Sequence, residues 1–406
     1  MTAVDRSADL NETGDPLAGT SGRLVVRDVR AVLADRIVDD ATVVCEGGLI
    51  VDVVEGPRSE PGAVSGHGAL CLPGLVDTHS DGLEKELRPR PTSRFPHDFA
   101  LRNFEQRLRA AGITTVFHGV GFEERSEYGR TIEQAEASCA VVDERSGDAD
   151  VPVDHRILFR MEARSHRGLP EAEAYFGGLD GPVLPLVSFE DHSPGQGQFR
   201  DVAKYAASIP DDKVPEGMTR DQFVDARIAA AEEAIHLRES KLEGLVAHAR
   251  AGRIRLLAHD CEDPQQVATA HAEWGASVAE FPLTIEAARR ARDLGMATVM
   301  GSPNVILGGS HSGNVAAEET VRAGVCSGLA SDYLPASLLA AAFLLAERGA
   351  TDLPGAVGLV TAGPAALAGL DDRGRLEVGR RADLVLVTPD GRWPRVRATW
   401  RLGLPA

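Results

Sequence analysis

Short apolar runs alternate with amphipathic stretches through most of this 406-residue chain. Each apolar run has the length of a strand and ends in polar residues, whereas the stretches between them have helical periodicity. The predicted strands end near His79, His118, Glu162, Asp191, His259, Glu280, Ser302 and Asp332. Helices are expected over 99–111, 131–144, 221–250, 264–274, 285–294, 315–323 and 335–347, and a shorter one is expected to end at Leu367-Ala-Gly369. This alternation predicts an α/β fold, a TIM-like (β/α)8 barrel, which typically takes about 250 residues.

The two ends of the chain have a different pattern, in which short strands are broken by turns. Strands are predicted over 24–33 and, interrupted by Gly47-Gly48, over 41–54, and a turn at Gly374 leads into a strand ending near Val387. We therefore expect a small β domain formed by both chain ends. The expected organisation is a disordered lead-in (1–20), the first part of the small β domain (21–70), the metal-dependent barrel (71–370) and the second part of the small domain (371–406).

The composition of the chain argues against some classes of binding partner. A formal net charge of −18 argues against a general nucleic-acid binder, which needs a basic face. There is no apolar run long enough to span a membrane and no basic-then-apolar start, so we expect a cytoplasmic protein without a membrane partner. The five cysteines lack C-x-x-C spacing, which is typical of reduced structural thiols. The sequence leaves the oligomeric state open, a homo-oligomer included.

Imidazoles and carboxylates follow several of the predicted strands. Because parallel barrel strands point their carboxyl ends at one mouth, these side chains are expected to converge. The candidate metal ligands are His79, Asp81, Glu162, His192, His259 and Asp332. Such a set suits one or two divalent ions, zinc or manganese. Any one of these residues alone could be a hydrogen-bonded structural group, but that explanation does not cover the whole set.

Two of these candidates are given distinct roles. If two ions bind, Glu162 is the candidate bridging carboxylate, and the ions would make a hydroxide nucleophile available near neutral pH. Asp332, after the last strand, is the candidate catalytic residue that accepts or donates a proton. His118 ends a predicted strand and is expected to point at the mouth, where it would either support the site or simply pack.

Clustered basic and amide side chains near these positions suggest a polyanionic substrate. Lys85, Arg88, Arg90 and Arg94 follow the first strand, and Gln196, Gln198 and Arg200 follow His192. In an acidic protein, such cations beside a metal site favour binding of phosphate groups, although surface ion pairs are the simpler alternative.

A glycine-rich loop follows the seventh strand, the place where barrels often bind phosphate. Its backbone N–H groups and small hydroxyls could hold an anion, and its candidate binding residues are Ser310, His311 and Asn314. The alternative is an ordinary surface loop.

Two segments resemble the two ends of the amidohydrolase superfamily. They are Leu72-Pro-Gly-Leu-Val-Asp-Thr-His79 and Gly374-Arg-Leu-Glu-Val-Gly-Arg-Arg-Ala-Asp-Leu-Val-Leu-Val387. The resemblance covers nearly the whole chain and implies a distorted metal-bearing barrel with a small β domain made from both termini.

Five spaced motifs narrow the resemblance. They are His79-Ser-Asp-Gly-Leu-Glu-Lys85 with Pro89-Arg-Pro91, Asp191-His-Ser-Pro-Gly-Gln-Gly-Gln-Phe-Arg200, Glu280-Phe-Pro282, Gly308-Gly-Ser-His-Ser-Gly-Asn314 and Ser331-Asp-Tyr333. They are similar to the diphosphatases of phosphonate utilisation, which act on α-D-ribose 1-methylphosphonate 5-triphosphate in the carbon-phosphorus lyase pathway. The resemblance implies hydrolysis of a small phosphorylated sugar, a ribose 5-triphosphate, to the 5-phosphate and pyrophosphate. It also adds Glu280 to the expected substrate-binding residues.

The chain departs from that family's pattern beside the expected substrate pocket. Gly82 stands where the family has Asn, and Glu86 and His118 stand near positions of His and Asp. Two alternatives therefore stay open. One is an amidohydrolase or deaminase that acts on a cyclic amide or another C–N bond, and the other is a non-catalytic binding protein on a decayed barrel.

Overall fold

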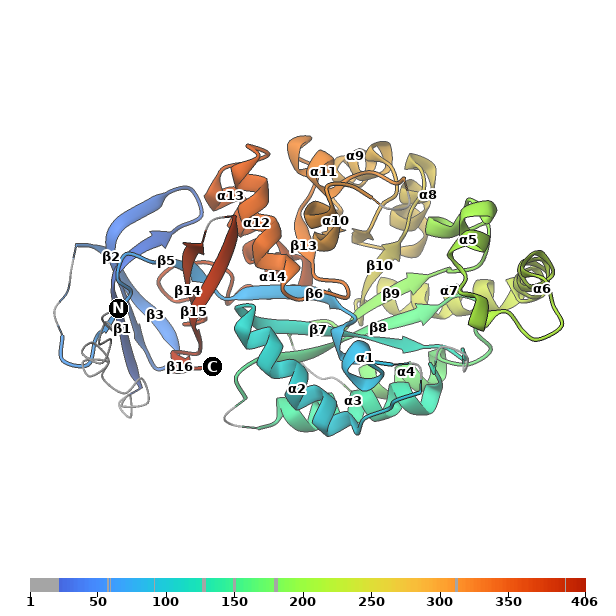
Figure 1. Ribbon diagram of the computed structural model, residues 1–406, viewed down its shortest axis with the longest axis horizontal. Coiled ribbons are helices and arrows are strands. Elements are labelled where there is room, and N and C mark those ends of the chain that lie inside the picture. Colours follow the sequence, from blue (N-terminus) through green and yellow to red (C-terminus); the bar gives the residue numbers. More distant parts are fainter. Residues whose placement is uncertain are drawn as a thin grey trace, which may run out of the picture.

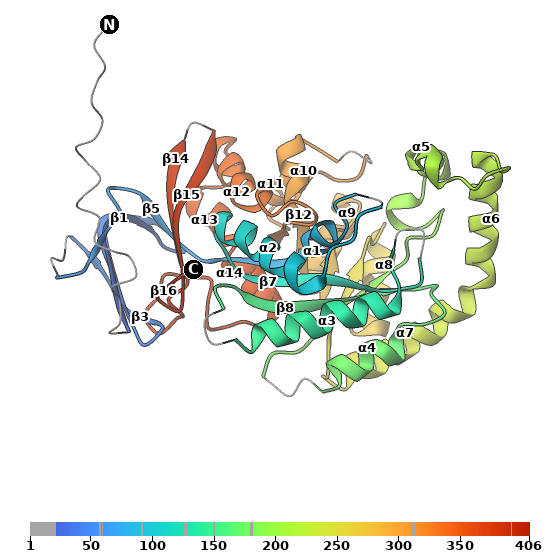
Figure 2. The ribbon, with the colours of Figure 1, turned by 60° about the horizontal axis from the view of Figure 1, so that its bottom comes forward.

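The computed structural model describes residues 22–406 except 57, 59, 91, 126–128, 149–150, 179–181, 311–312 and 391. The predicted lead-in (1–20) and the candidate residue His311 lie outside the described residues. The chain forms a barrel-like parallel sheet surrounded by helices and, beside it, a second sheet that contains strands from both chain ends (Figures 1 and 2).

Eight parallel strands form the predicted barrel. They are β6 (Leu75–Ser80), β7 (Ile113–Phe122), β8 (Asp154–Glu162), β9 (Leu186–Glu190), β10 (Arg255–His259), β11 (Val278–Glu280), β12 (Ala297–Gly301) and β13 (Gly328–Ala330). The first and last strands meet through a parallel bridge between Ser80 and Asp332, where the Asp332 N–H donates to the His79 carbonyl at 2.9 Å. The barrel is therefore nearly closed, and its closure lies at the candidate site.

The predicted end of the second strand is wrong by four residues, because β7 continues past His118 to Phe122. Gly119 and Gly121 fall in this extension and weaken its apolar pattern. Pairing with β8 continues through them, up to Phe122 opposite Met161, and holds the strand together.

The helices cover the outside of the barrel (Figure 1). They are α1 (Gly82–Leu87), α2 (His97–Ala110), α3 (Ile132–Ser146), α4 (Leu169–Phe176), α5 (Val202–Ser208), α6 (Arg220–Glu233), α7 (Ile235–Arg250), α8 (Pro264–Thr269), α9 (Ile285–Asp293), α10 (Ser302–Leu307), α11 (Ala317–Arg322), α12 (Ser337–Glu347), α13 (Leu353–Gly358) and α14 (Ala362–Ala368). The longer helices lie where the sequence predicts them. The helices absent from the prediction, α1, α4, α5, α10 and α13, have six to eight residues, too few for a clear period of 3.6.

The single helix predicted over 221–250 is instead two helices that meet at Ala234. A straight helix of that length would extend about 45 Å, whereas the longest barrel strand, β7, has ten residues and spans about 33 Å. α7 packs on the barrel through Leu245, whereas α6 turns away to pack with α5 around Tyr205 and Val224 (Figure 2). Helices α5 and α6 thus form a lobe beside the barrel mouth.

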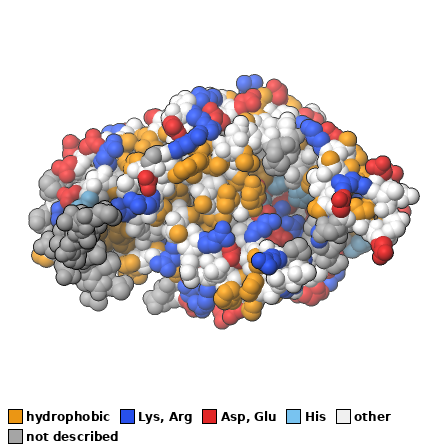
Figure 3. Space-filling model, viewed as in Figure 1, with side chains coloured by type: hydrophobic (Ala, Val, Ile, Leu, Met, Phe, Trp, Pro, Cys, Tyr) orange, Lys and Arg blue, Asp and Glu red, His pale blue; other side chains and the backbone are white. Residues whose placement is uncertain are grey.

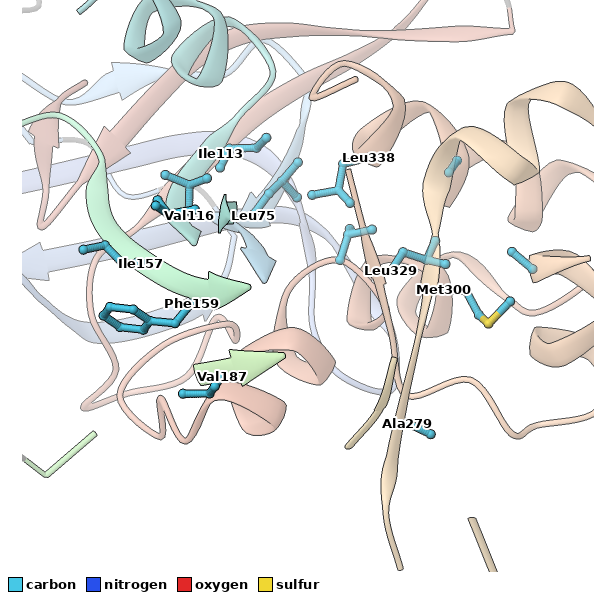
Figure 4. Close-up of a cluster of buried hydrophobic side chains, with 14 of the residues drawn as sticks. Leu75, Ile113, Val116, Ile157, Phe159, Val187, Ala279, Met300, Leu329 and Leu338 are labelled. Carbon is cyan, nitrogen blue, oxygen red and sulfur yellow. The ribbon is translucent and has the colours of Figure 1, made fainter. Parts of the chain in front are cut away.

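Alternating strand residues separate two apolar layers. One residue from each strand fills the barrel interior: Val76, Phe117, Leu158, Leu186, Leu257, Val278, Val299 and Ala330. Their neighbours face outward into the larger core beneath the helices, as Figure 4 shows for Leu75, Val116, Phe159 and Leu329. This alternation sets which later residues of each strand can reach the barrel mouth.

The second sheet confirms that both ends of the chain form one β unit. Its strands are β1 (Arg23–Val32), β2 (Ile37–Glu46), β3 (Leu49–Glu55), β4 (Val64–Ser65), β5 (Leu70–Pro73), β14 (Leu384–Asp390), β15 (Trp393–Arg401) and β16 (Leu404–Pro405). Strand β5 pairs with β1 on one side and with β14 on the other, so it joins the two ends. The boundary expected at residue 71 falls inside β5.

All five cysteines are free thiols, as expected for reduced structural residues. Among the described residues, no helix is both long enough and apolar enough to span a membrane.

Candidate metal centre and adjoining cationic cavity

The inward alternation of the barrel strands continues into their polar ends. Residues two or four positions beyond the interior apolar layer also face inward, and those that carry a charge or an imidazole are Arg160, Glu162, Glu190, His259, Glu280 and Asp332. His79 and Asp81, at the end of β6, meet them across the closure between the first and last strands. The barrel therefore collects these groups at one mouth, as the sequence predicts.

Three groups of side chains at this mouth could each hold a metal ion. In one of them, His79, His259 and Glu280, the carboxylate is already hydrogen-bonded to both imidazoles. The other two, called the metal groups below, contain His79, Asp81 and Asp332, and His192, His259 and Asp260. Within each group, one nitrogen or oxygen atom per residue lies within 4.8 Å of those of the other two. Five of these six residues are predicted ligands, and Asp260 is the addition.

The three histidines are held so that one ring nitrogen remains available to an ion. The Nδ1 atoms of His79 and His259 each lie 2.8 Å from a carboxylate oxygen of Glu280. The Nδ1 atom of His192 lies 2.9 Å from Glu162. A carboxylate on Nδ1 orients the ring and leaves Nε2 as the ligand atom, an arrangement that is usual for a metal-binding histidine.

The charges around the two metal groups also suit a divalent cation. Burial alone would lower the pKa of His259, but Asp260, Glu190 and Glu280 raise it to about 9. Burial also opposes ionisation of Asp81, yet Arg160 and His79 hold the pKa of that carboxyl well below its usual range. Ionised carboxylates that draw protons onto neighbouring imidazoles would equally favour a metal ion. The donor set of imidazole nitrogens and carboxylate oxygens therefore fits zinc or manganese.

Glu162, the predicted bridging carboxylate, has a different position. Its Oε1 accepts the His192 backbone N–H at 3.1 Å and its Oε2 is bonded to Nδ1 of the same residue. Both oxygens are thus used to orient His192, and Glu162 is absent from both candidate metal groups.

Glu280, expected among the substrate-binding residues, has no exposed surface. It lies beneath His79 and His259 and also accepts the Ser188 hydroxyl at 2.5 Å. This position serves to orient the two histidines and leaves no side-chain surface for a substrate to touch.

Asp332 has the features of a group that exchanges a proton. Burial and the nearby Asp81 carboxylate raise the pKa of Asp332 to about 6. Its backbone has a φ of 55°, a conformation that non-glycine residues seldom adopt, and Asp260 in the other metal group has the same φ. Such backbone strain is concentrated at functional sites.

Arg160 occupies the centre of the mouth. Its Nε and Nη2 donate to Glu190 at 2.9 and 3.0 Å, and its Nη1 donates to Asp81 at 2.7 Å. Gly119 on β7 makes room for it, because a Cβ there would lie 2.6 Å from Asp81 Oδ1 and 3.0 Å from Arg160 Cδ. Arg160 was not among the predicted site residues, although its position two residues before Glu162 predicts the same inward direction.

Two connected cavities open at this mouth. The metal cavity, of about 320 Å³, is lined by members of both metal groups and by residues of the loops after β11, β12 and β13. The cationic cavity, of about 570 Å³, lies beside it under the α5–α6 lobe. Arg160, His192 and Gln198 line both. In Figure 3, histidine side chains are visible in a recess beside this lobe, with Lys and Arg side chains next to it.

The cationic cavity is lined by basic residues from four separate parts of the chain: Lys85, Arg88, Arg90, Arg125, Arg130, Arg160, Lys213 and Arg227. Glu84 is the one carboxylate among its described lining residues. Arg130 is bonded to Glu84 through two contacts of 2.8 Å. Lys85 and Arg90 are exposed and make no ion pair with another described residue. In a chain with a net charge of −18, this concentration of positive charge is suited to a polyanion.

Five of the predicted substrate-binding residues lie in one or the other of the two joined cavities. Lys85, Arg88 and Arg90 line the cationic cavity, and Ser310 and Asn314 line the metal cavity.

The remaining predictions for substrate binding lie elsewhere. Gln196 lines a third cavity behind His259, and Arg200 is exposed and lines neither of the two joined cavities. Gln198, from the same predicted segment, lies in a short 3-10 turn (Gly197–Phe199) and lines both of the joined cavities.

His118, predicted to point at the mouth, faces the opposite way. It follows the inward-facing Phe117, so its ring points out of the barrel toward Phe104 of α2. Its Nε2 lies 2.9 Å from Nδ1 of His155, whose Nε2 is bonded to Glu105. His118 therefore belongs to the packing between β7, β8 and α2.

Arg125 and Arg130 were missed because the second strand was predicted to end too early. With β7 ending at Phe122, both arginines fall in the loop that follows a barrel strand, and that signal would have identified them. Lys213 and Arg227 belong to the α5–α6 lobe, and no local pattern in the sequence relates them to the site.

Comparisons with known proteins agree with this geometry. Residues 202–402 match the amidohydrolase family. The chain is 35% identical over 382 residues to the alpha-D-ribose 1-methylphosphonate 5-triphosphate diphosphatase of Escherichia coli (strain K12), a match that covers 94% of this chain and 99% of the relative.

Solved structures share the fold at low sequence identity. The 5-methylcytosine deaminase of Klebsiella pneumoniae is 16% identical, with a TM-score of 0.61 and coverage of 94% of this chain and 97% of that chain. The dihydropyrimidinase of Brevibacillus agri is 13% identical, with a TM-score of 0.56 and coverage of 94% of both chains. These likenesses show the fold. The family match and the match along nearly the whole length of the E. coli relative show that the chain belongs to the amidohydrolase superfamily and, within it, to the family of alpha-D-ribose 1-methylphosphonate 5-triphosphate diphosphatase.

Proposed function

We propose that the protein is a metal-dependent diphosphatase that hydrolyses a ribose 5-triphosphate, α-D-ribose 1-methylphosphonate 5-triphosphate, to the 5-phosphate and pyrophosphate. The observation that carries the proposal is the cationic cavity, with its eight basic residues, directly beside two groups of metal-type ligands. A neutral cyclic amide would have no use for such a cavity. The activity of the E. coli relative supports the same substrate class.

The residues of the site fit roles in this reaction. One P–O bond of the α–β phosphoanhydride breaks, the oxygen of water is added to phosphorus, and the bridging oxygen leaves with pyrophosphate. A bound divalent ion would supply a Lewis acid for a phosphoryl oxygen and would acidify water. Asp332, whose pKa is raised to about 6, would take up the proton of the attacking water, and the basic residues would bind the negative charge of the triphosphate.

The proposal also gives a role to the carboxylates that orient the metal-binding histidines. Glu280 and Glu162 would hold the three histidines in the tautomer that presents Nε2. Arg160, shared by both cavities, would contact phosphate at their junction. The chain's own contribution is thus mainly orientation and charge, as is general for phosphoryl transfer.

The test is pyrophosphate release from a panel of 5-triphosphates by protein reconstituted with zinc or manganese. The panel contains ribose 5-triphosphate, its 1-methylphosphonate derivative and nucleoside 5′-triphosphates, with cyclic amides and aminopyrimidines as a separate arm. Metal-dependent release of pyrophosphate is the expected result. Hydrolysis of a C–N bond without release of pyrophosphate would reject the proposal and favour the amidohydrolase alternative.

A further inference from the structure

The two joined cavities differ in charge. Apart from Arg160 and the histidines, the described residues that line the metal cavity include no basic side chain. Its three carboxylates, Asp81, Asp260 and Asp332, all belong to the candidate metal groups. The positive charge of the cleft is therefore concentrated at one end, in the cationic cavity.

The other end of the cleft is neutral and partly apolar. Phe281 lies against His79 and His259, and the lining continues to Leu307 and the amides of Asn304 and Asn314. Leu307, on α10, is 63% exposed and lies at the open edge of the wall. Such a surface can contact a sugar ring and hydrogen-bond its hydroxyl groups, but these described lining residues offer no cation to a phosphate. Lys204 lies outside the lining, with its Nζ 3.3 Å from the position of a Cβ at Gly313.

We infer that a triphosphate substrate binds in one orientation, with the pyrophosphate half in the cationic cavity and the sugar in the neutral end of the metal cavity. This inference rests on the proposed function and adds the direction of the substrate to it. The junction of the two cavities, where Arg160, His192 and Gln198 line both, then receives the bond between the α- and β-phosphates.

Electrostatics favours this direction over its reverse. A reversed substrate would place the most highly charged part of the molecule at the neutral wall, without basic partners, and the sugar among cations that it cannot neutralise. In the inferred direction, the departing pyrophosphate also leaves from a site that already binds its charge. The substituent at C1 of the sugar then lies toward the open edge near Leu307 and Tyr333.

This orientation determines how the protein would select among substituents at C1 of the sugar. Because the described residues that line the neutral end supply no cation for a C1 phosphonate, affinity for the substrate should depend strongly on the pyrophosphate group and only weakly on the charge at C1. The C1 substituent would be selected by shape at the edge of the cavity.

The experiment measures binding of each product to the metal-loaded full-length protein by calorimetry. The ligands are pyrophosphate, ribose 5-phosphate and ribose 1-methylphosphonate 5-phosphate. The variants are Lys85→Ala/Arg90→Ala at the charged end and Leu307→Arg at the neutral end. All three positions are exposed, so the fold should tolerate the changes, and Arg289→Ala on α9 is a control that also removes a surface charge.

The two variants should affect the binding of different products. The double variant should weaken pyrophosphate binding about tenfold or more and change ribose 5-phosphate binding less than twofold. Leu307→Arg should leave pyrophosphate binding unchanged and strengthen binding of the phosphonate-bearing sugar severalfold. Stronger pyrophosphate binding in Leu307→Arg, equal losses for all ligands in the double variant, or no binding of any product by the wild-type protein would each overturn the inferred orientation.

The binding measurements and the pyrophosphate-release assay together distinguish a wrong orientation from a wrong reaction. If the binding pattern holds but no triphosphate releases pyrophosphate, the orientation of phosphate and sugar stands and the proposed chemistry is rejected. If pyrophosphate is released but the variants give the reversed pattern, the reaction stands and the orientation is wrong.

Discussion

His79 and His118 both lie in barrel strands and are both buried, but their surroundings differ because they face opposite sides of the sheet. His79 faces the mouth and is oriented by Glu280, whereas His118 faces α2. Burial lowers the pKa of His118 well below its usual value, and the neighbouring His155 lowers it further, so His118 is a neutral packing residue. The direction of a side chain thus separates a site residue from a core residue of the same type. Strand alternation sets that direction for His118 in β7, whereas in β6 the register shifts between Asp77 and Ser80, where His79 lies.

At the residue scale, Asp332→Asn should lower kcat by about 100- to 10,000-fold, the range for loss of a general acid–base group. Bound metal and the melting temperature should stay close to those of the wild-type protein, because Asn retains the size of the side chain and one oxygen ligand. Steady-state pyrophosphate release, elemental analysis and thermal unfolding check these expectations. A loss of bound metal in proportion to the loss of activity would show that Asp332 acts chiefly as a ligand.

Gly82 provides a second test at this scale. A Cβ at Gly82 would lie 2.2 Å from Cζ of Phe104, a residue with no exposed surface in the barrel's outer core. Gly82→Ala should therefore lower the free energy of unfolding by about 1–3 kcal/mol through overpacking.

Chemical denaturation measures the effect of Gly82→Ala. A second change, Phe104→Leu, should recover part of the loss. Gly358→Ala is the matched control, since a Cβ there meets nothing within 4 Å. Equal effects of Gly82→Ala and Gly358→Ala would refute the packing explanation.

At the element scale, a buried ionic cluster joins α2, α3 and β8. Glu105 of α2 accepts Nε and Nη2 of Arg145 on α3 at 2.8 and 2.9 Å, and its carboxylate also lies 3.1 Å from His155 Nε2. Burial would raise the pKa of Glu105, but the bonds from His155 and Arg145 lower it from 4.5 to about 2. The ionised carboxylate therefore stabilises the contact of three elements.

This cluster predicts a pH dependence of stability. Since the pKa of Glu105 is lower in the folded protein, its contribution is fully present above about pH 4.5 and is lost as the pH falls toward 2. The shift corresponds to roughly 3 kcal/mol at neutral pH. Glu105→Gln should lose about that stability at pH 7 and should show a flatter decline of melting temperature between pH 4.5 and 2. Glu286→Gln, at an exposed position on α9, is the control. If the melting temperature of Glu105→Gln fell between pH 4.5 and 2 as steeply as that of the wild-type protein, Glu105 would not be the source of this pH dependence.

Most elements of the fold could be predicted from local periodicity, and the departures have local causes. The period-2 pattern of β8 places its end at Glu162, as observed. In β7, Gly119 and Gly121 interrupt that pattern, so the strand was predicted to end early and its following arginines were not recognised. The bend at Ala234 was not predicted, because residues on both sides of it favour a helix and the bend depends on what α6 and α7 pack against.

At the scale of the whole molecule, the barrel gathers many carboxylates at one end of a protein that is already acidic. The mouth contains Asp81, Glu162, Glu190, Asp260, Glu280 and Asp332. A divalent ion bound among them relieves their mutual repulsion in the folded state, whereas the unfolded chain separates them. Metal should therefore stabilise the protein as well as support catalysis.

Removal of divalent ions with a chelator should abolish hydrolysis and lower the melting temperature. Zinc or manganese at 100 times its dissociation constant should restore about 2.7 kcal/mol. His259→Ala should largely lose this stabilisation, whereas His67→Ala, an exposed residue that follows β4, should keep it. Thermal scans with and without metal make the comparison, and identical metal-dependent shifts in both variants would place the ion elsewhere.

The sequence by itself determined the alternating strands and helices, the pairing of both chain ends in a second sheet, and the presence of His79, Asp81, His192, His259 and Asp332 at the barrel mouth. These features follow from patterns that repeat every two or 3.6 residues and from the common direction of parallel strands. Only the tertiary structure decided that Glu162 orients His192, that Glu280 lies beneath two histidines, and that basic residues from four distant segments form one cavity. Those relations depend on strand register, side-chain direction and the placement of the α5–α6 lobe, which are set by contacts between residues far apart in the sequence.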